Sequence, residues 1–410
     1  MAKRVNKRFL IILIVVLIAI VASIAGIYYV LIKINNNPTR LVAEAKVALK
    51  NNDTELARSL YQQAAVVSLH DHLPQAAKIL VKLGDLNYQT TPQNIDRFRA
   101  ALSDWHAAIQ QNPNLLTAHK KLLDAFYQDA VHSANDSSLW QQIEIQADHV
   151  IKLDPKNATA YMDRAQARLR SVSGLAALTN RRFTAAKTDL RIACKLQPDN
   201  ILPHALLAQV YLQQAAAEHA QNLITTSAMT KLSDKGIAIL KGFALKHPKN
   251  VDALLALTAI YRMVPGHVND ADKIMAAAQA MAPNNPKVLE AQAQQLLMRG
   301  AAPARIAAIF KKVVAIKPDD MSAYAAAGEF LRRANHPHQA IEYLKKGLAH
   351  PTPGGGLTPE INQNVSLRMN QMLMGAYLQL ATQAPGGSDI RKNYLARASD
   401  TLAWVAQRMP

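Results

Sequence analysis

Two short tripeptides each place two histidines close enough in sequence to suggest a metal site. They are His70-Asp71-His72 and His336-Pro337-His338. Imidazole and carboxylate groups are good zinc ligands, but a zinc site needs three or four ligands that converge on the ion. Both tripeptides fall in predicted turns, and the neighbouring sequence offers no third and fourth ligand. We therefore expect solvent-exposed histidines there and no metal site.

Other residue types that carry chemistry are also isolated. The single cysteine, Cys194, follows Leu190 by one helical turn, where a small buried side chain is expected, so we interpret it as a structural thiol. The run Gly354-Gly355-Gly356 lacks the lysine and the preceding strand of a phosphate-binding loop. Neither a serine nucleophile elbow nor a distinctive carboxylate pair is present. The sequence predicts no enzyme activity and no cofactor.

Composition favours helices. Half of the 410 residues are apolar, yet aromatic residues make up only 5% and alanine is abundant. Alanine has the best helix propensity, and its small side chain lets helices approach closely. We therefore expect an all-α chain of closely packed helices.

A unit of two short amphipathic helices recurs along most of the chain, and residues 317–351 are its most regular copy. Prolines close successive units at intervals of 42, 43, 50, 35, 35 and 33 residues: Pro113, Pro155, Pro198, Pro248, Pro283, Pro318 and Pro351. Two residues after five of them comes a side chain able to cap the next helix, namely Asn157, Asn200, Asn250, Asn285 and Asp320. This shared spacing predicts a repeat array.

In the regular copy, Tyr324 precedes Gly328 by four residues, and Ala340 and Leu344 follow on the second helix. This order of residues resembles the tetratricopeptide repeat (TPR) family. The resemblance implies a TPR-type α-solenoid of helix-turn-helix repeats, in which these four residues pack inside the unit. It also implies a protein-binding scaffold.

The array is predicted to cover residues 41–351, beginning with a hairpin of helices at 41–49 and 55–67. The stretches 171–180 and 215–230 lengthen two units, either as longer loops or as extra helical turns. Pro351 to Gly356 forms a break, and a C-terminal TPR-like hairpin is expected over residues 358–410, with Ala398, Leu402 and Val405 in repeat register.

The N-terminus carries a membrane signal. Residues 1–8 are basic, and residues 9–32 contain no charge. A helix of that length reaches roughly 36 Å, enough to cross a bilayer core of roughly 30 Å. Cleavage after Ser23-Ile24-Ala25 is the alternative, but the apolar run continues beyond a signal-peptide core. We expect an uncleaved single-pass anchor, with the basic tail in the cytoplasm and the repeats outside it.

The resemblance also implies which residues face a partner, because ligands of this family lie against the first helix of each repeat. Carried over by position, the candidate partner-binding residues are Met162, Gln166, Arg170, Gln209, Gln213, Arg262, Glu290, Gln294, Glu329, Arg332 and Arg333. Ordinary solvated helix surface is the competing interpretation of each residue. The set of Lys, Asn and Arg that clamps an acidic peptide tail in some family members is missing.

Charge leaves two classes of ligand open. Lys and Arg number 47 against 29 Asp and Glu, and residues 1–40 hold six of the former and none of the latter. The rest of the chain therefore carries +12, which permits an anionic polymer. No long basic run is interleaved with aromatic residues, which disfavours nucleic acid as a partner.

Our leading hypothesis is a membrane-anchored scaffold at a bacterial inner membrane that binds or assembles other proteins. We expect these partners to be membrane-associated. The first alternative is binding of an anionic polymer, such as an exopolysaccharide during export. The second alternative is that the sequence is an N-terminal fragment whose catalytic domain follows Pro410.

Overall fold

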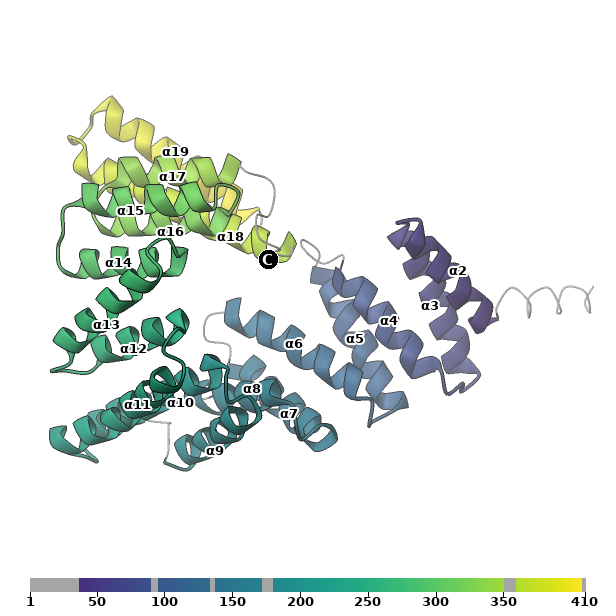
Figure 1. The fold of residues 1–410 in the computed structure, drawn as a ribbon. Helices are drawn as coiled ribbons and strands as arrows, with labels where there is room; N and C mark the ends of the chain where they lie inside the picture. The colour runs from purple at the N-terminus through teal and green to yellow at the C-terminus, as the bar shows by residue number, and fades with distance from the viewer. Residues whose placement is uncertain (1–36, 90–94, 133–136, 172–179, 350–358, 408–410) are drawn as a thin grey trace, which may run out of the picture. The chain divides into compact units, whose positions relative to one another are not determined.

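The structure, a computed structural model, describes residues 37–89, 95–132, 137–171, 180–349 and 359–407. Every regular element in these ranges is an α helix (Figure 1), as the composition predicts. The chain divides into two compact units, residues 1–125 (unit 1) and residues 126–410 (unit 2). Each unit is considered by itself below.

Unit 1 contains two helical hairpins. Its helices are α2 (Pro38–Lys50), α3 (Thr54–His70), α4 (Ala76–Gln89) and α5 (Ile95–Gln111), and α6 (Leu116–His132) crosses the boundary between the units. Helix α2 pairs with α3, α4 pairs with α5, and α3 packs on α4. The expected first hairpin is confirmed, with slightly longer helices. Asn37 and Asp53 cap the N-termini of α2 and α3.

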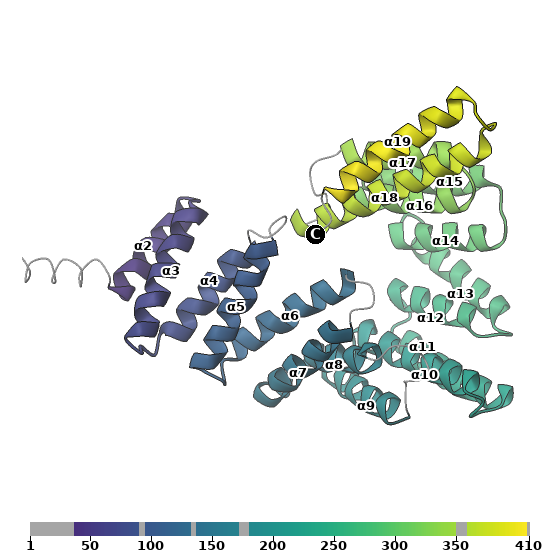
Figure 2. The ribbon, with the colours of Figure 1, turned by 180° about the vertical axis from the view of Figure 1, so that it is seen from behind.

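Unit 2 continues the same pattern, which can be followed from both sides in Figures 1 and 2. Its helices are α7 (Ser137–Leu153), α8 (Ala158–Arg170), α9 (Asn180–Leu196), α10 (Ile201–Ala220), α11 (Thr226–Lys246), α12 (Val251–Met263), α13 (Val268–Met281), α14 (Pro286–Met298), α15 (Pro303–Ile316), α16 (Met321–Arg333), α17 (Pro337–Ala349), α18 (Pro359–Gln383) and α19 (Asp389–Ala406). We call the first helix of each hairpin the A helix and the second the B helix.

Contacts in unit 2 follow the order of the repeats. The hairpins are α8–α9, α10–α11, α12–α13, α14–α15, α16–α17 and α18–α19, and a B helix packs on the next A helix, as α15 does on α16. The A helices α10, α12, α14, α16 and α18 also contact one another in sequence. Stacked helix-turn-helix units of this kind confirm the predicted all-α, TPR-like architecture.

The caps predicted from the proline spacing are present. The side chains of Asn157, Asn200, Asn250, Asn285 and Asp320 each accept a hydrogen bond from a backbone N–H in the first turn of α8, α10, α12, α14 and α16. Such a bond satisfies one of the N–H groups that a helix N-terminus leaves without an intrahelical partner. The caps start these five A helices at equivalent repeat positions.

The regular repeat packs as its pattern predicts. Tyr324, Ala340 and Leu344 are at most 6% exposed, and Gly328 is buried. A Cβ at Gly328 would lie 2.5 Å from Leu344, and one at Gly347 would lie 2.6 Å from the Cβ of Tyr324. Glycine at these two places therefore allows α16 and α17 to approach closely.

The longer units gain their extra residues as helix. Residues 215–230 extend α10 to 20 residues and α11 to 21, whereas α12 and α13 have 13 and 14. Extra helical turns, one of the two expected outcomes, are therefore observed here. Of the other insertion, residues 172–179 lie outside the described residues, as do residues 350–358 of the predicted break.

The last hairpin departs from the pattern at one residue. Ala398 and Val405 on α19 are buried, as expected, but Leu402 is 52% exposed. Thr401 takes the buried place beside them. The equivalent Phe310 on α15 lies between α14 and α16, and no described helix covers Leu402 in that way.

The predicted basic tail (1–8) and transmembrane helix (9–32) lie outside the described residues. Among the helices that the structure does describe, none is both long and apolar enough to cross a membrane.

Candidate interaction surface

The candidate partner-binding residues lie on the A helices α8, α10, α12, α14 and α16, and we call their joint face the A-helix surface. Arg170, Gln209, Gln294 and Arg333 are exposed, while Gln166, Gln213, Arg262, Glu290, Glu329 and Arg332 are partly buried. The structure thus brings most of these residues to the surface of neighbouring repeats.

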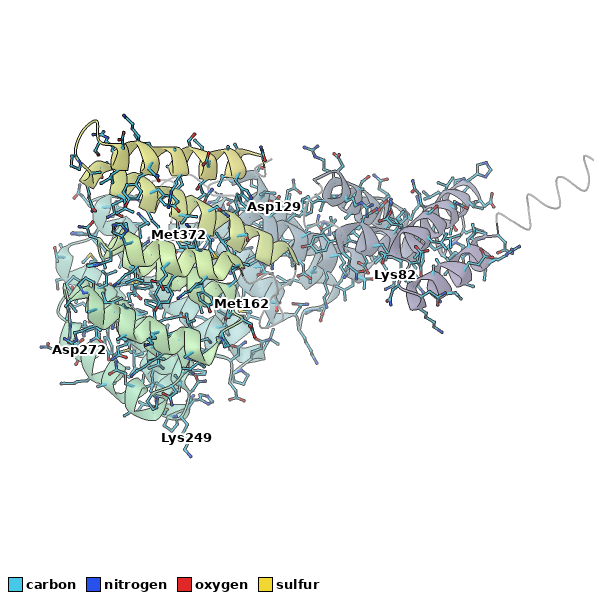
Figure 3. All side chains as sticks on the ribbon, turned by 90° about the horizontal axis from the view of Figure 1, so that it is seen from above. Lys82, Asp129, Met162, Lys249, Asp272 and Met372 are labelled. Carbon is cyan, nitrogen blue, oxygen red and sulfur yellow. The ribbon has the colours of Figure 1, made fainter. Side chains whose placement is uncertain are left out.

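Met162 lies elsewhere. This residue, labelled in Figure 3, is only 5% exposed and belongs to a core cluster with Tyr161, Phe183 and Leu190. The family position placed it on the partner-binding face, and the structure corrects that expectation. Helix α8 is covered by both α7 and α9, so a long apolar side chain at this point is drawn into the core.

Two exposed methionines lie on A helices that form the A-helix surface. Met263 and Met298 end α12 and α14 and are 65% and 66% exposed. Arg170 and Arg333 end α8 and α16 at the same point. Methionine is flexible and polarizable, and it is common at surfaces that adapt to a protein partner. The ends of these four A helices therefore offer two methionines together with two arginines.

Arg262 and Arg299 are next to these methionines in sequence, and they differ in their hydrogen-bond partners. Arg299 donates to Asp272 of α13, and Gln295 donates to the same carboxylate. The Nη2 atom of Arg262 is buried, and no group in the described part of the chain accepts a hydrogen bond from it. Burial lowers the pKa of Arg262, although Asp272 acts in the opposite direction.

On α16, one carboxylate serves two arginines. The Nε atom of Arg333 donates to Glu329 at 2.7 Å, and Arg332 donates to both oxygens at 3.2 and 3.3 Å. Burial by itself would raise the pKa of Glu329. The hydrogen bonds and charges of Arg332 and Arg333 have a larger effect in the opposite direction, so the pKa is lowered. The cluster is therefore ionised at neutral pH and carries one excess positive charge.

Glu290 on α14 is a second partly buried carboxyl of the A-helix surface. Burial raises its pKa, and the nearby charges of Lys317 and Lys287 oppose that effect. Its environment therefore differs from that of Glu329, which has two guanidinium partners in direct contact.

Helices α6, α7 and α8 add a group of contacts that the repeat spacing did not reveal. Gln166 donates to the hydroxyl of Tyr127 at 2.9 Å, and the ring of Tyr127 meets the ring of Trp140 edge-on at 5.9 Å. The guanidinium of Arg170 lies 4.8 Å from the centre of the Trp140 ring. Two of the predicted residues, Gln166 and Arg170, are thus held by aromatic neighbours. Cation–π geometry of this kind is well suited to arginine.

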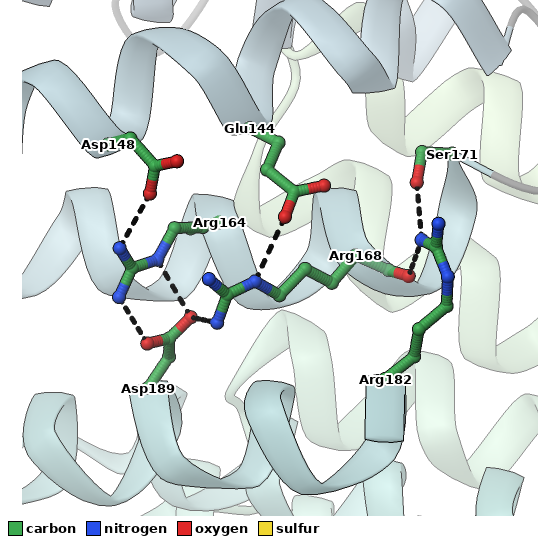
Figure 4. Close-up of polar contacts among 7 residues, drawn as sticks. All are labelled: Glu144, Asp148, Arg164, Arg168, Ser171, Arg182 and Asp189. Carbon is green, nitrogen blue, oxygen red and sulfur yellow. Dashed lines mark hydrogen bonds and ion pairs between the residues drawn. The ribbon is translucent and has the colours of Figure 1, made fainter. Parts of the chain in front are cut away.

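A network of ion pairs joins α7, α8 and α9 (Figure 4). Arg164 and Arg168 both donate to Asp189, at 2.5–3.0 Å and 2.6 Å. Arg164 also contacts Asp148, and Arg168 contacts Glu144. Asp189 is 2% exposed. Because every charge has a partner within the network, we assign it a structural role in fixing α8.

The residues considered first for chemistry stay apart from one another. Burial raises the pKa of the Cys194 thiol to about 11, which keeps it protonated and unreactive at neutral pH. His70 contacts Asp71 and is well exposed, whereas His338 lies inside α17 and faces the ring of Tyr394. Within the described ranges, no three His, Cys, Asp or Glu side chains are arranged to hold a metal ion.

Comparison with known proteins finds similarity at the level of structure. No protein-family model matches the sequence, and no curated protein matches it. A TPR protein from Parabacteroides merdae covers 81% of this chain and 98% of its own, with 10% identity and a TM-score of 0.45. The C-terminal part of a TPR-containing protein from Cytophaga hutchinsonii covers 66% and 93%, with 13% identity and a TM-score of 0.42. YrrB, a TPR protein described as having an unusual peptide-binding site, covers 54% and 94%, with 11% identity and a TM-score of 0.35. At this identity the similarity concerns the fold alone.

Proposed function

We propose that this chain is a membrane-anchored, TPR-like scaffold that binds a protein partner on its A-helix surface at a bacterial cell envelope. The observation that carries the binding site is the pair of exposed methionines at the ends of α12 and α14. Each is about two-thirds exposed, and two other A helices, α8 and α16, end in Arg170 and Arg333. Interface centres are enriched in methionine and arginine and depleted of lysine and glutamate.

The arginines define the polar part of the proposed contact. Arg170 and Arg333 are exposed, and Arg332 and Arg333 share Glu329. A partner segment with apolar side chains and a few acceptor groups would complement this surface. Burying two methionines would contribute a few kcal/mol, about what a small cluster of central contacts supplies.

The membrane part of the proposal comes from the sequence of residues 9–32. An anchor would hold the repeats at one membrane surface and raise their effective concentration toward membrane-associated partners. Alkaline washing of membranes from cells that express the full chain tests this point. We expect the chain to stay with the membranes, and its release into the wash would contradict the anchor.

A photo-crosslinking amino acid placed at Met298 tests the binding surface. We expect it to give a discrete protein adduct in cells that express the full chain. Leu245 is a matched control, because it is an apolar residue that is 74% exposed near the end of a B helix, away from the A-helix surface. Double replacement of Met263 and Met298 by glutamate should abolish capture of the same protein by a tag on the chain.

Two results would count against this site. The first is an identical set of adducts from Leu245 and Met298, which would indicate random collision. The second is undiminished capture by the double glutamate variant when its helical content, measured by circular dichroism, equals that of the parent.

Binding of an anionic polymer is the second candidate, favoured by the excess positive charge of the Glu329 cluster and the +12 surplus outside residues 1–40. Ionic strength separates the two candidates. Polymer binding should weaken steeply between about 50 and 500 mM salt, because it depends on attraction between exposed charges, which salt screens. A contact centred on methionines should change little over the same range.

A further inference from the structure

Lys187 on α9 is a partly buried lysine whose polar contacts are to neutral groups. Its Nζ atom donates to the side-chain oxygen of Gln214 on α10 at 2.7 Å and lies 4.9 Å from the centre of the Tyr211 ring. Within the described ranges, no carboxylate forms an ion pair with Lys187. An amide and an aromatic ring compensate only part of the cost of desolvating an ammonium group.

Two further cations lie close to Lys187. Arg191, one turn further along α9, is exposed and donates to the hydroxyl oxygen of Tyr211 at 2.8 Å. A Cβ at Gly236 of α11 would lie 2.8 Å from a carbonyl oxygen of α10, so the adjacent residue Lys235 is held beside α10 as well. Burial lowers the pKa of Lys187, and the positive charges of Arg191 and Lys235 lower it further. We call Lys187, Arg191 and Lys235 the cation cluster.

The acidic groups near the cation cluster bind elsewhere. Glu218 on α10 accepts a hydrogen bond from Gln214 at 2.7 Å and acts on the cluster only through its charge. Asp234, directly before Lys235, lies 3.4 Å from His267. Three cations and the single carboxylate of Glu218 leave the cluster with a net charge of +2. Helix α10 packs on both α9 and α11, so it brings these like charges together.

The preceding A helix treats a similar cation differently. Arg164 on α8 lies 5.5 Å from the centre of the Tyr161 ring, as Lys187 lies over Tyr211. Arg164 is also paired with Asp148 and Asp189, so its charge is compensated inside the protein. The cation cluster has no such compensation from the described residues. Cations held together in this way attract an anion that neutralises them.

The donors around Tyr211 favour a phosphate group as that anion. The Tyr211 hydroxyl accepts from Arg191, so its own proton is left to donate to a ligand. A phosphate dianion carries about two negative charges and several strong acceptor oxygens. It would balance the net charge of +2, and the planar fork of an arginine fits its oxygens. A carboxylate would neutralise only half of the charge.

We propose that Lys187, Arg191, Tyr211 and Lys235 form a binding site for a phosphate dianion, supplied either as free phosphate or as the phosphomonoester of a small molecule. Tyr211 is two residues from both Gln209 and Gln213, which places it about 200° from each around α10. The site is therefore on another side of this helix from the A-helix surface, and it does not depend on the protein partner proposed above.

Isothermal titration of the full chain in a mild detergent with inorganic phosphate tests the site. At about pH 7.5 and about 100 mM sodium chloride, we expect a Kd on the order of 0.1–1 mM. Arg191→Gln should weaken binding about tenfold or more, because it removes a charge and a donor. Lys241→Gln is the matched control, since it removes an exposed cation six residues after Lys235 on another side of α11.

Folding of the two variants is checked by circular dichroism. Arg191 and Lys241 are both exposed, so neither substitution should change the helical content. A parent that does not bind phosphate would overturn the proposal. Equal weakening by the two substitutions, or no weakening by Arg191→Gln, would show general attraction to a basic surface and would overturn it too.

Tyr211→Phe tests the hydroxyl separately. This substitution keeps the ring beside Lys187 and removes only the proposed donor, so we expect phosphate binding to weaken about threefold or more. Unchanged binding would contradict a site built around Tyr211. Titration with glycerol 3-phosphate separates the two sources of the ligand. Tighter binding than that of inorganic phosphate would assign the site to a phosphomonoester, and equal or weaker binding would assign it to free phosphate.

Discussion

Asp104 on α5 in unit 1 and Asp189 on α9 in unit 2 both lie nine residues before a proline that follows their helix. Their partners differ. Asp104 accepts one hydrogen bond from the neutral amide of Asn87 at 2.7 Å, and burial raises the pKa of Asp104 to about 6. Asp189 is more deeply buried, but it accepts from Arg164 and Arg168.

This difference shows that the A helix facing a carboxylate decides what the carboxylate does. An amide partner leaves the cost of desolvating Asp104 largely uncompensated, and the group responds with a raised pKa. Two guanidinium partners supply opposite charge and several donors, so Asp189 can be buried as an ion. At the same distance from the next three prolines, α11, α13 and α15 carry Ile239, Ile274 and Ile309. There the position is apolar.

Ile309→Asp would place a carboxylate at this position without an arginine partner. Ile309 is 7% exposed and packs with Leu289, Phe310 and Ala323. We expect a loss of about 4 kcal/mol in local stability, from lost apolar burial and from desolvation of the new group. Amide hydrogen exchange in α14, α15 and α16 measures this loss. Ile309→Val should cost only about 1 kcal/mol. Equal effects of the two substitutions would contradict our interpretation.

Asp189→Ala should have the next largest effect. It removes the carboxylate shared by Arg164 and Arg168, whose side chains are only 16% and 20% exposed. Breaking such a partly buried network should cost about 3 kcal/mol, because Asp148 and Glu144 compensate only in part. Hydrogen exchange of α8 and α9 should increase, while exchange of α16 and α17 stays unchanged. A loss below about 1 kcal/mol would show that solvent replaces the missing carboxylate.

Asp104→Asn should act in the opposite direction and more weakly. The ordinary pKa of Asp is 3.8, and it rises to about 6 in the folded hairpin. The folded state therefore binds more protons between these values, so its stability falls as pH rises from about 4 to about 6 and stays low above that. Removing the charge should stabilise α4–α5 by about 1 kcal/mol at pH 7, allowing for partial exposure, and by little at pH 4.

Tryptophan fluorescence can follow this hairpin selectively. Trp105 is adjacent to Asp104 and 1% exposed, so it reports on α5 once Trp140 and Trp404 are replaced by phenylalanine. Thermal unfolding of the parent and the Asp104→Asn variant at pH 4 and pH 7 gives the comparison. Asp96→Asn, on the same helix but well exposed, is the control. An equal shift for both variants at the two pH values would exclude burial of Asp104 as the cause.

Local rules account for much of the fold. Helix starts at Asn157, Asn250 and Asp320 follow from a capping side chain two residues after a proline, and the packing of Gly328 against Leu344 follows from the repeat spacing. Both kinds of signal are contained within a few residues or one repeat. The exposure of Leu402 could not be predicted in this way, because it depends on the absence of a covering helix among the described residues.

The candidate surface was less predictable. The family resemblance placed Arg262, Glu329 and Arg333 on A helices, which is where they lie. It gave no information about which charged side chains form ion pairs. Asp189 is 25 residues from Arg164 and 21 from Arg168, and the side-chain rotamers determine which of several acceptors each arginine contacts. Met162 was misplaced because exposure at a family position changes with the helices that cover it.

Glu342→Ala probes the exposed limit of the same comparison. Glu342 on α17 lies two residues before the buried Leu344, whereas Asp104 and Asp189 directly precede the buried Trp105 and Leu190. Glu342 is 60% exposed and pairs with Lys346 one turn away at 2.7 Å. The hydrogen bond from Lys346 to Glu342 raises the pKa of the lysine. Solvent and salt screen such a pair, so we expect thermal unfolding to shift by less than about 1 °C. A loss of stability as large as that expected for Asp189→Ala would mean that burial and the facing A helix do not set the contribution of a carboxylate.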